Sequence, residues 1–244
     1  MHMNSYEKYI SHHFGNLHPA QTIHREYRRY LRYYNANIIP LLPKDKSCSI
    51  LEIGPGMGHF LYCLKQNGYT NVSAVDVSPE CVTFCHKMGF TFVKEAHGLK
   101  YLQQVEQCFD VICMFDVIEH FPKGHIFILL EYCRKKLTQN GLLLIKTLNA
   151  GQPFLGMSNY YSDITHQTAF TCSSLMEVLR LCEFSRVKCI GINLYVFYLN
   201  PFNYLAALCA VLISVFFKLY FTLHSRGMKY REIFTKDIMA IGQP

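Results

Sequence analysis

Short, continuously apolar runs alternate along residues 48–148 with longer segments in which apolar residues recur every three or four positions. The runs predict buried strands, and the longer segments predict helices. Strands that are apolar on both sides need cover on both faces, so the pattern favours a mostly parallel sheet between two layers of helices. The predicted strands are residues 48–53, 72–77, 90–93, 108–115 and 142–148, and the predicted helices are 58–66, 79–88 and 123–137.

The two ends of the chain follow other patterns. Residues 1–46 are interpreted as an N-terminal helical lid, because residues 24–39 have helical spacing and prolines follow them. One face of that helix is basic and carries Arg25, Arg28, Arg29 and Arg32. Residues 47–244 read as one domain, since no repeat or linker divides them. Its last part is expected to comprise a loop at 150–171, a helix at 173–182, strands at 185–199 and 233–241, and a strongly hydrophobic stretch between these strands.

Composition narrows the class of protein. The chain has 244 residues, of which 50% are hydrophobic and 17% charged, and this suits one folded α/β domain and excludes a disordered chain. The net charge of +7 suits phosphates, nucleic acid or anionic lipid as well as simple solubility. The 11 cysteines form no C-x-x-C pair, and the first residues lack the apolar core of a signal peptide. A reduced, cytoplasmic location is therefore predicted.

A glycine-rich turn follows the first predicted strand. Gly54, Gly56 and Gly58 have the spacing G-x-G-x-G, whereas dinucleotide-binding turns use G-x-G-x-x-G, whose third glycine is replaced here by His59. Glycines let a backbone turn sharply and approach a ligand closely. Glu52, two residues before the first glycine, would repel a pyrophosphate but suits a cationic ligand.

This stretch resembles motif I of the class I methyltransferases that depend on S-adenosyl-L-methionine (SAM), whose pattern is acidic-x-G-x-G-x-G. The resemblance implies a Rossmann-like, seven-stranded, mostly parallel sheet with helices on both faces and an antiparallel last strand. It implies SAM as cofactor, with Asp76, at the end of the second strand, holding both ribose hydroxyls. The match near residues 95–97, where relatives often bind adenine, is imperfect, and His97 is predicted to be a surface residue. The implied cofactor-binding residues are Glu52, Gly54, Gly56, Gly58, Asp76 and Phe115.

The segment after the fourth strand is similar to the family motif that leads to the transferable methyl group. Asp116, Glu119 and His120 are therefore expected near the chemistry. Three roles stay open: packing and capping at the turn, substrate orientation or general base work by His120, and a divalent metal site shared by all three. Methyltransferases of ubiquinone biosynthesis carry a similar Glu-His pair. The motif N/D-P-P-[YF], typical of relatives that modify nitrogen in DNA or protein, is absent from residues 115–118.

Residues 163–171 resemble the D-x-T-H-x-x-x-F-T segment of many methyltransferases from bacterial polysaccharide and lipid-linked pathways. His166 is predicted to take a proton from an attacking hydroxyl, with Asp163 fixing its tautomer. The alternative is that both residues only brace a substrate loop. Histidine supplies a base of pKa near 7 without large perturbation, which suits a hydroxyl acceptor.

Residues 203–224 form a hydrophobic insertion between the last two predicted strands. In the resembled fold these strands pair, so a single membrane crossing between them would place them on opposite sides of the bilayer. The insertion is therefore predicted to dock on a membrane surface, with a partner chain such as a second copy, or the core, as alternatives. Basic residues beside it favour an anionic surface: Lys218, His224, Arg226, Lys229 and Arg231.

Together these features predict a SAM-dependent O-methyltransferase, peripheral on the cytoplasmic face of a membrane. Its acceptor would be a small molecule such as a sugar, a lipid-linked glycan or a prenylated ring. A non-catalytic methyltransferase-like scaffold at a membrane is one rival interpretation. Another is an RNA methyltransferase that uses the basic N-terminal helix, although the sequence does not favour nucleic acid as a partner.

Overall fold

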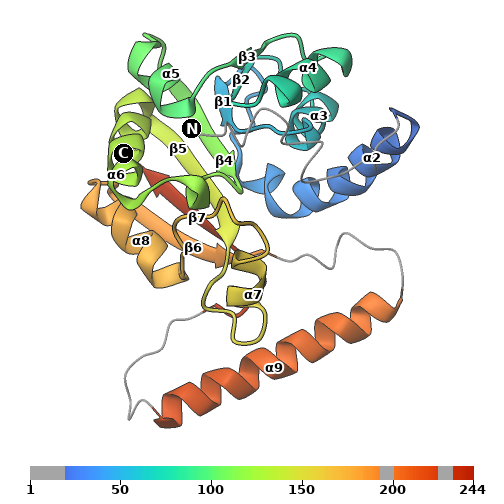
Figure 1. The fold of residues 1–244 in the computed structure, drawn as a ribbon, viewed down its shortest axis with the longest axis vertical. Helices are drawn as coiled ribbons and strands as arrows, with labels where there is room; N and C mark the ends of the chain where they lie inside the picture. The colour runs from blue at the N-terminus through green and yellow to red at the C-terminus, as the bar shows by residue number, and fades with distance from the viewer. Residues whose placement is uncertain (1–19, 193–200, 225–232) are drawn as a thin grey trace.

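The computed structural model describes residues 20–192, 201–224 and 233–244, and it contains one seven-stranded sheet (Figure 1). The strand order is β3-β2-β1-β4-β5-β7-β6. Strands β1 to β5 pair in parallel, and β7 lies antiparallel between β5 and β6. The predicted fold class is confirmed. The strands are β1 Ile50–Ile53, β2 Val72–Asp76, β3 Val93–Glu95, β4 Phe109–Phe115, β5 Leu137–Leu148, β6 Arg186–Gly191 and β7 Asp237–Gln243.

Helices cover both faces of the sheet because neighbouring residues of each strand point to opposite sides. In β4, Ile112 and Met114 pack under α5, α6 and α8, whereas Val111 and Cys113 pack under α2 and α3. A smaller cluster joins α2, α3 and α4 around Ala74 of β2. The helices are α2 Ala20–Asn37, α3 His59–Gln66, α4 Pro79–Lys87, α5 Gly98–Gln104, α6 Lys123–Lys136, α7 Gly156–Tyr160, α8 Cys172–Leu181 and α9 Phe202–His224, with 3-10 turns η1 Ile39–Leu41 and η2 Ile118–His120.

Several boundaries differ from the sequence expectations. The third strand begins at Val93 rather than at residue 90, because Phe90 is buried among the side chains of α2, α3 and α4. The fifth strand begins at Leu137, so the Asn-Gly pair at 140–141 lies within β5 and does not end the preceding helix. The last strand begins at Asp237 rather than at residue 233. The short helices α5 and α7 carry too few turns to show a periodic pattern, and neither was expected.

Helix α2 packs on α3 and reaches the glycine turn. Ile23, Tyr27 and Tyr34 face inward, while Arg25 and Arg28 are exposed, as the amphipathic pattern predicts. The hydroxyl of Tyr27, a residue that is only 1% exposed, donates a hydrogen bond of 2.6 Å to the main-chain oxygen of Met57. The helix is thus tied to the turn between Gly56 and Gly58.

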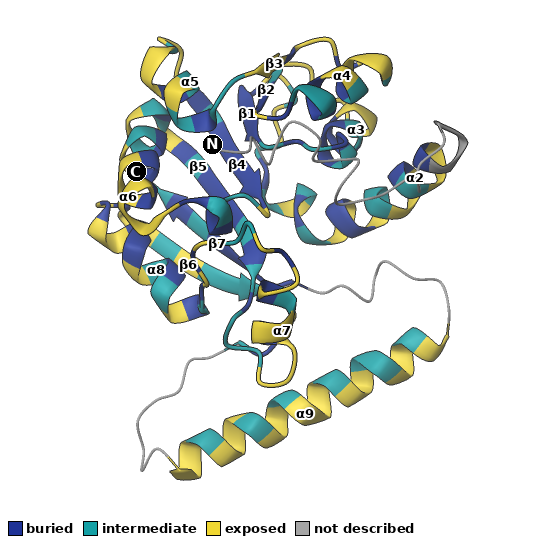
Figure 2. Cartoon of the chain, in the orientation of Figure 1, coloured by how far each residue is buried: buried dark blue, intermediate teal, exposed yellow. Residues whose placement is uncertain are grey.

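Helix α9 stands apart from the rest of the fold. None of its residues is buried, and it extends beside the loop of α7 (Figures 1 and 2). Its contacts with the domain include aromatic pairs, with the ring of Phe217 lying 5.2 Å from that of Phe154 and 5.9 Å from that of Phe234. The predicted insertion between the last two strands is therefore a single exposed helix.

We predict that Tyr27→Phe lowers the free energy of unfolding by about 1 kcal/mol, because the buried carbonyl of Met57 loses its donor while the ring packing is kept. Urea unfolding followed by circular dichroism measures the change. Tyr62→Phe, at the ring stacked 4.8 Å from Tyr27, is the matched control and should unfold like the wild type. Equal midpoints for all three proteins would show that the bond contributes nothing.

Candidate active site

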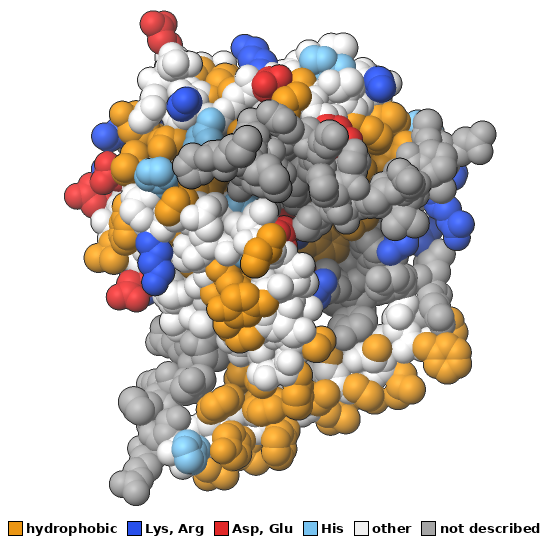
Figure 3. Space-filling model, viewed as in Figure 1, with side chains coloured by type: hydrophobic (Ala, Val, Ile, Leu, Met, Phe, Trp, Pro, Cys, Tyr) orange, Lys and Arg blue, Asp and Glu red, His pale blue; other side chains and the backbone are white. Residues whose placement is uncertain are grey.

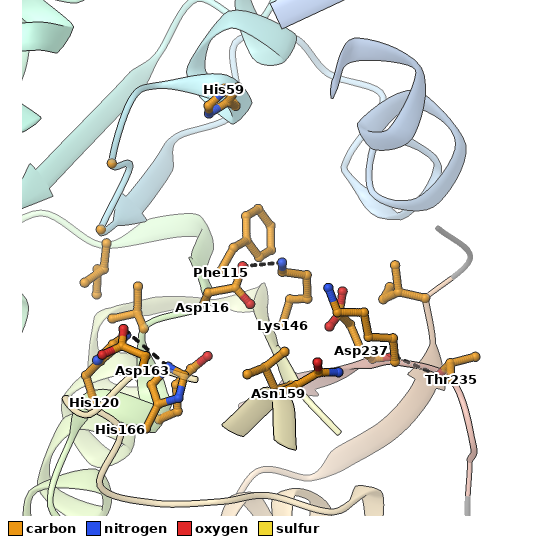
Figure 4. Close-up of a pocket in the computed structure, with 18 of the residues that line it drawn as sticks. His59, Phe115, Asp116, His120, Lys146, Asn159, Asp163, His166, Thr235 and Asp237 are labelled. Carbon is orange, nitrogen blue, oxygen red and sulfur yellow. Dashed lines mark hydrogen bonds and ion pairs between the residues drawn. The ribbon is translucent and has the colours of Figure 1, made fainter. Parts of the chain in front are cut away.

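A cavity of about 1420 Å³ opens at the carboxyl ends of the parallel strands. Its walls come from the glycine turn after β1, the segments after β2, β3 and β4, the inner side of α2, the loop at residues 152–167, and α9. Ligands bind at this edge in open α/β sheets. Residues from distant parts of the sequence therefore meet around one space (Figure 4).

The glycine turn has the backbone shape that only glycine adopts easily. Gly54, Gly56 and Gly58 have φ angles of +75°, +53° and +75°. A Cβ atom on Gly54 would lie 2.5 Å from the Val117 side chain, whereas a Cβ on Gly56 would meet no atom within 4 Å. The main chain at Gly56 therefore lies open to a ligand in the cavity.

Two buried carboxyl groups lie behind this turn. Asp76 accepts hydrogen bonds from the main-chain nitrogens of Gly56 (3.0 Å) and Ser78 (2.9 Å). Glu52 is 3% exposed, and its Oε2 has no hydrogen-bond partner. Burial, together with the neighbouring Asp76, raises the pKa of Glu52 to about 8. An unpartnered carboxylate in a desolvated position gains from a cationic ligand and opposes a pyrophosphate, so the residues present fit a sulfonium nucleoside.

Two further residues complete this half of the cavity. Phe115 is buried, packs edge-on against Phe60 with ring centres 5.0 Å apart, and lines the cavity as predicted. His97, which the sequence placed on the surface, is half-buried in the cavity wall, and burial lowers its pKa. It precedes the first residue of α5, the helix that the sequence did not reveal. His97 thus lies in the part of the cavity wall that follows β3.

His120, Asp163 and His166 meet at the opposite side of the cavity, with one ligand-type atom from each within 4.8 Å of the others (Figure 4). The hydroxyl of Thr165 donates to Asp163 Oδ1 at 2.7 Å. The hydroxyl has only one proton, and it is used in the bond to Asp163. In the 2.9 Å contact between this hydroxyl and His120 Nδ1, the histidine nitrogen is therefore the donor. His120, when neutral, therefore carries its lone pair on Nε2.

The tautomer of His166 is fixed by a group that the sequence did not suggest. Its Nδ1 donates to the main-chain oxygen of Tyr160 at 2.6 Å. Asp163 Oδ2 instead lies 3.9 Å from Nε2, where it stabilises an imidazolium rather than selecting the tautomer. Neutral His166 thus presents an unprotonated Nε2. Burial, with a contribution from the nearby His166, lowers the pKa of His120 to about 4, so His120 is neutral at pH 7.

The residues predicted as a metal set take different positions. Asp116 forms an ion pair with Lys146, and His120 faces Asp163 and His166. Glu119 is buried, and burial and Asp116 raise its pKa to about 8. Its main-chain oxygen accepts bonds from the nitrogens of residues 167 (2.8 Å) and 168 (3.0 Å), which anchors the histidine loop. Among the described residues, the set that could hold a divalent cation is therefore His120, Asp163 and His166. Its two imidazole nitrogens and one carboxylate suit a transition metal.

Lys146 is a cavity residue that the sequence analysis missed. Burial would lower its pKa, but Asp116, Tyr33 and Asp237 outweigh burial and hold the pKa well above its usual value. Its side chain lies between the ends of β4 and β7 (Figure 4). The sequence did contain a hint of this role, since Lys146 is the one charged residue of β5 and follows a run of four apolar residues.

Comparison with known proteins identifies the family. Residues 25–186 match the family model described as a methyltransferase domain. The chain belongs to this methyltransferase family. Its sequence matches none of the curated proteins with which it was compared. The family, and the fit of the glycine turn and its carboxylates, make SAM the cofactor of the cavity.

Solved structures of SAM-dependent methyltransferases share the fold of this methyltransferase. One from Archaeoglobus fulgidus is 21% identical, with a TM-score of 0.62 over 97% of this chain and 98% of that one. One from Thermotoga maritima is 17% identical, with a TM-score of 0.59 over 97% and 99%. The plantazolicin methyltransferase BpumL, solved with SAH, is 19% identical, with a TM-score of 0.58 over 98% and 93%.

We predict that the affinity for SAM rises with pH up to about 8, because the cationic cofactor prefers the ionised form of Glu52. The rise should reach up to about tenfold per pH unit in wild type and disappear in Glu52→Gln. Isothermal titration calorimetry in buffers of different ionisation enthalpy measures the affinity and the released proton. An identical pH dependence in both proteins would contradict this role of Glu52.

The raised pKa of Glu52 also determines how the free energy of unfolding changes with pH. The unfolded chain loses this proton near the ordinary pKa of 4.5, and the folded chain loses it near 8. The free energy of unfolding without cofactor therefore falls as pH rises through that window, and Glu52→Gln should lessen the fall.

Proposed function

We propose that this methyltransferase transfers the methyl group of SAM to a hydroxyl group of a sugar, a lipid-linked glycan or a prenylated small molecule at a membrane surface. The observation that carries the proposal is the unprotonated Nε2 of His166, which lies in the same cavity as the glycine turn. A base opposite a methyl donor is the arrangement that a hydroxyl acceptor needs.

The chain's own residues supply positioning and proton transfer. SAM provides an electrophilic methyl group on a sulfonium centre. His166 Nε2 takes the proton of the acceptor hydroxyl as the oxygen–carbon bond forms and the sulfur–carbon bond breaks, which leaves a methyl ether and SAH. Asp163, 3.9 Å from Nε2, stabilises the imidazolium that results. The glycine turn and the loop anchored on Glu119 hold donor and acceptor in line, which is worth several kcal/mol.

His166 suits the role of base better than His120. The low pKa of His120 makes it a weak proton acceptor at pH 7. Its Nδ1 is linked through Thr165 to Asp163, which fixes the position of the carboxylate. His120 therefore supports the orientation of the cluster, and His166 carries the proton.

The membrane part of the proposal is supported by α9. Within the described residues, this 23-residue helix is the one segment long and apolar enough to cross a bilayer. However, β6 and β7, which flank it, pair from Arg186 with Gln243 to Gly191 with Ile238. A single crossing by α9 would place β6 and β7 on opposite sides of the bilayer, which their pairing does not allow. A helix lying in the interface of the cytoplasmic leaflet satisfies both constraints.

We predict that His166→Ala lowers kcat by about 10²–10⁴-fold and leaves the affinity for SAM unchanged, because the base acts on the acceptor. The assay measures tritium transfer from labelled SAM to lipid and glycan extracts. His24→Ala, at an exposed position on α2, is the control. Activity should persist in EDTA, and a loss that added divalent cation restores would assign the cluster to a metal instead.

We predict that Leu212→Glu weakens binding to anionic vesicles by about tenfold or more, since burying a leucine contributes about 1.5–3 kcal/mol. Leu212 is 60% exposed on α9, and Leu181, 65% exposed on α8, supplies the matched control Leu181→Glu. Sedimentation with phosphatidylglycerol-containing vesicles measures binding, and deletion of residues 203–224 should abolish it. Unchanged pelleting of the deletion variant, or stronger binding to RNA than to vesicles, would refute membrane docking.

A further inference from the structure

The two faces of α9 carry different side chains. The outward face holds large apolar residues at more than half exposure, among them Leu208, Leu212, Phe216 and Leu219. The half-buried positions recur every three or four residues and face the domain. Between residues 206 and 214 these half-buried positions are small, namely Ala206, Ala207, Ala210 and Ser214.

The half-buried face of α9 contacts the domain closely near its C-terminal end, whereas its small residues border open space. Near the C-terminal end of α9, Phe217 and Phe221 each lie 5.9 Å from the ring of Phe234, and Phe217 also contacts Phe154. Further toward the N-terminal end, Ala207, Ala210 and Ser214 line the cavity itself. The small side chains therefore border an open groove, and the aromatic contacts hold the helix against the domain.

This groove is continuous with the cofactor site. The same cavity includes the glycine turn, His166, Asn159 and Leu155 of the α7 segment, and the small residues of α9. Its volume of about 1420 Å³ exceeds the roughly 300–1,000 Å³ of ordinary small-molecule pockets. The cavity is polar at His166. Its α9 side is lined mostly by apolar residues, among them Leu155, Ala210 and Val211, with Ser214 and Lys218 as the polar members from α9. It therefore has room for a second ligand that is polar at one end and mostly apolar at the other.

The surface beside the groove is also apolar. Phe154, Leu155 and Met157, at or beside the start of α7, are about half exposed or more. In Figure 3 hydrophobic side chains gather over α7 and along the neighbouring α9, on the same side of the molecule. A water-soluble acceptor would leave both the groove and its rim in contact with water.

We propose that the groove between α9 and the α7 segment holds the hydrocarbon chain of a lipid acceptor whose hydroxyl head lies at His166. The inference rests on the proposed function and narrows its acceptor to lipids that enter from the bilayer on which α9 lies. The outward face of α9 contacts the bilayer, and the small inward residues form one wall of the passage. A hydrocarbon chain is the occupant because it is continuous with the membrane that the outward face requires.

Ala210→Trp tests the passage, because a large side chain at this position fills the groove without changing the outward face. Tritium from labelled SAM should appear in the organic phase of a membrane extract. Transfer should fall by about 10²-fold or more in Ala210→Trp, since displacing the acceptor from the methyl donor costs about that much. Binding of SAM and of vesicles should stay unchanged, and Leu181→Trp should transfer like the wild type. A methylated product found in the aqueous phase, or normal transfer by Ala210→Trp, would overturn the proposal.

Photolabelling tests the groove without catalysis. It therefore distinguishes a failure of the groove proposal from a failure of the proposed methyl transfer. The probe is hexadecanol with a diazirine at the chain end, in phosphatidylcholine–phosphatidylglycerol vesicles. Labelling of Leu155 or of Ala210, located at single-residue resolution by fragmentation and lost in Ala210→Trp, supports the groove even if no methyl transfer occurs. Labelling confined to outward positions such as Leu212 and Phe216 would overturn it.

Discussion

The cofactor half of the site depends on two desolvated carboxyl groups held behind a turn of three glycines. Folding places Glu52 among apolar side chains with one oxygen unpartnered, and it binds Asp76 to the main chain of the turn. Burial of a carboxylate is unfavourable unless a positive charge or hydrogen bonds compensate. The fold therefore keeps Glu52 partly protonated until a cation arrives. The positive φ angles of the turn leave the main chain, rather than side chains, in contact with that cation.

The sheet places the cluster of His120, Asp163 and His166 opposite this turn. Both the glycine turn and the Asp116–His120 segment follow parallel strands, so they emerge at the same edge. The loop that carries Asp163 and His166 comes from much later in the chain. It is fixed there because its main-chain nitrogens bond to the carbonyl of Glu119. The side chains of Gln167 and Thr168 add bonds to the main-chain oxygens of His120 and Phe121. These bonds bring two histidines from separate motifs into a single cluster, a relation that depends on tertiary structure.

Periodicity predicted the alternation of strands and helices, and glycine spacing pointed to the cofactor turn. The antiparallel last strand and the place of Phe115 in the cavity were expected only from the resemblance to the methyltransferase family. The short helix α5 was not predicted, because it has fewer than two full turns and so shows no period. His97, which precedes α5, was predicted to lie on the surface and instead lies in the cavity wall. The tautomer of His166 depends on the carbonyl of Tyr160, and sequence patterns do not report main-chain acceptors. Lys146 was visible as the one charged residue of β5, but its partners are distant in the sequence, because Asp116 directly follows β4 and Asp237 begins β7.

The exposed apolar helix α9, which lies between β6 and β7 in the sequence, forms one wall of the cavity. The strands β6 and β7 that flank α9 pair with each other, and the small-residue face of α9 borders the cavity. All of this presupposes that the glycine turn binds a sulfonium nucleoside. Calorimetric titration of the wild type and of Asp76→Ala with SAM and with NAD tests that claim most directly. We expect saturable SAM binding that Asp76→Ala abolishes and no binding of NAD; NAD binding that displaces SAM would contradict a sulfonium site.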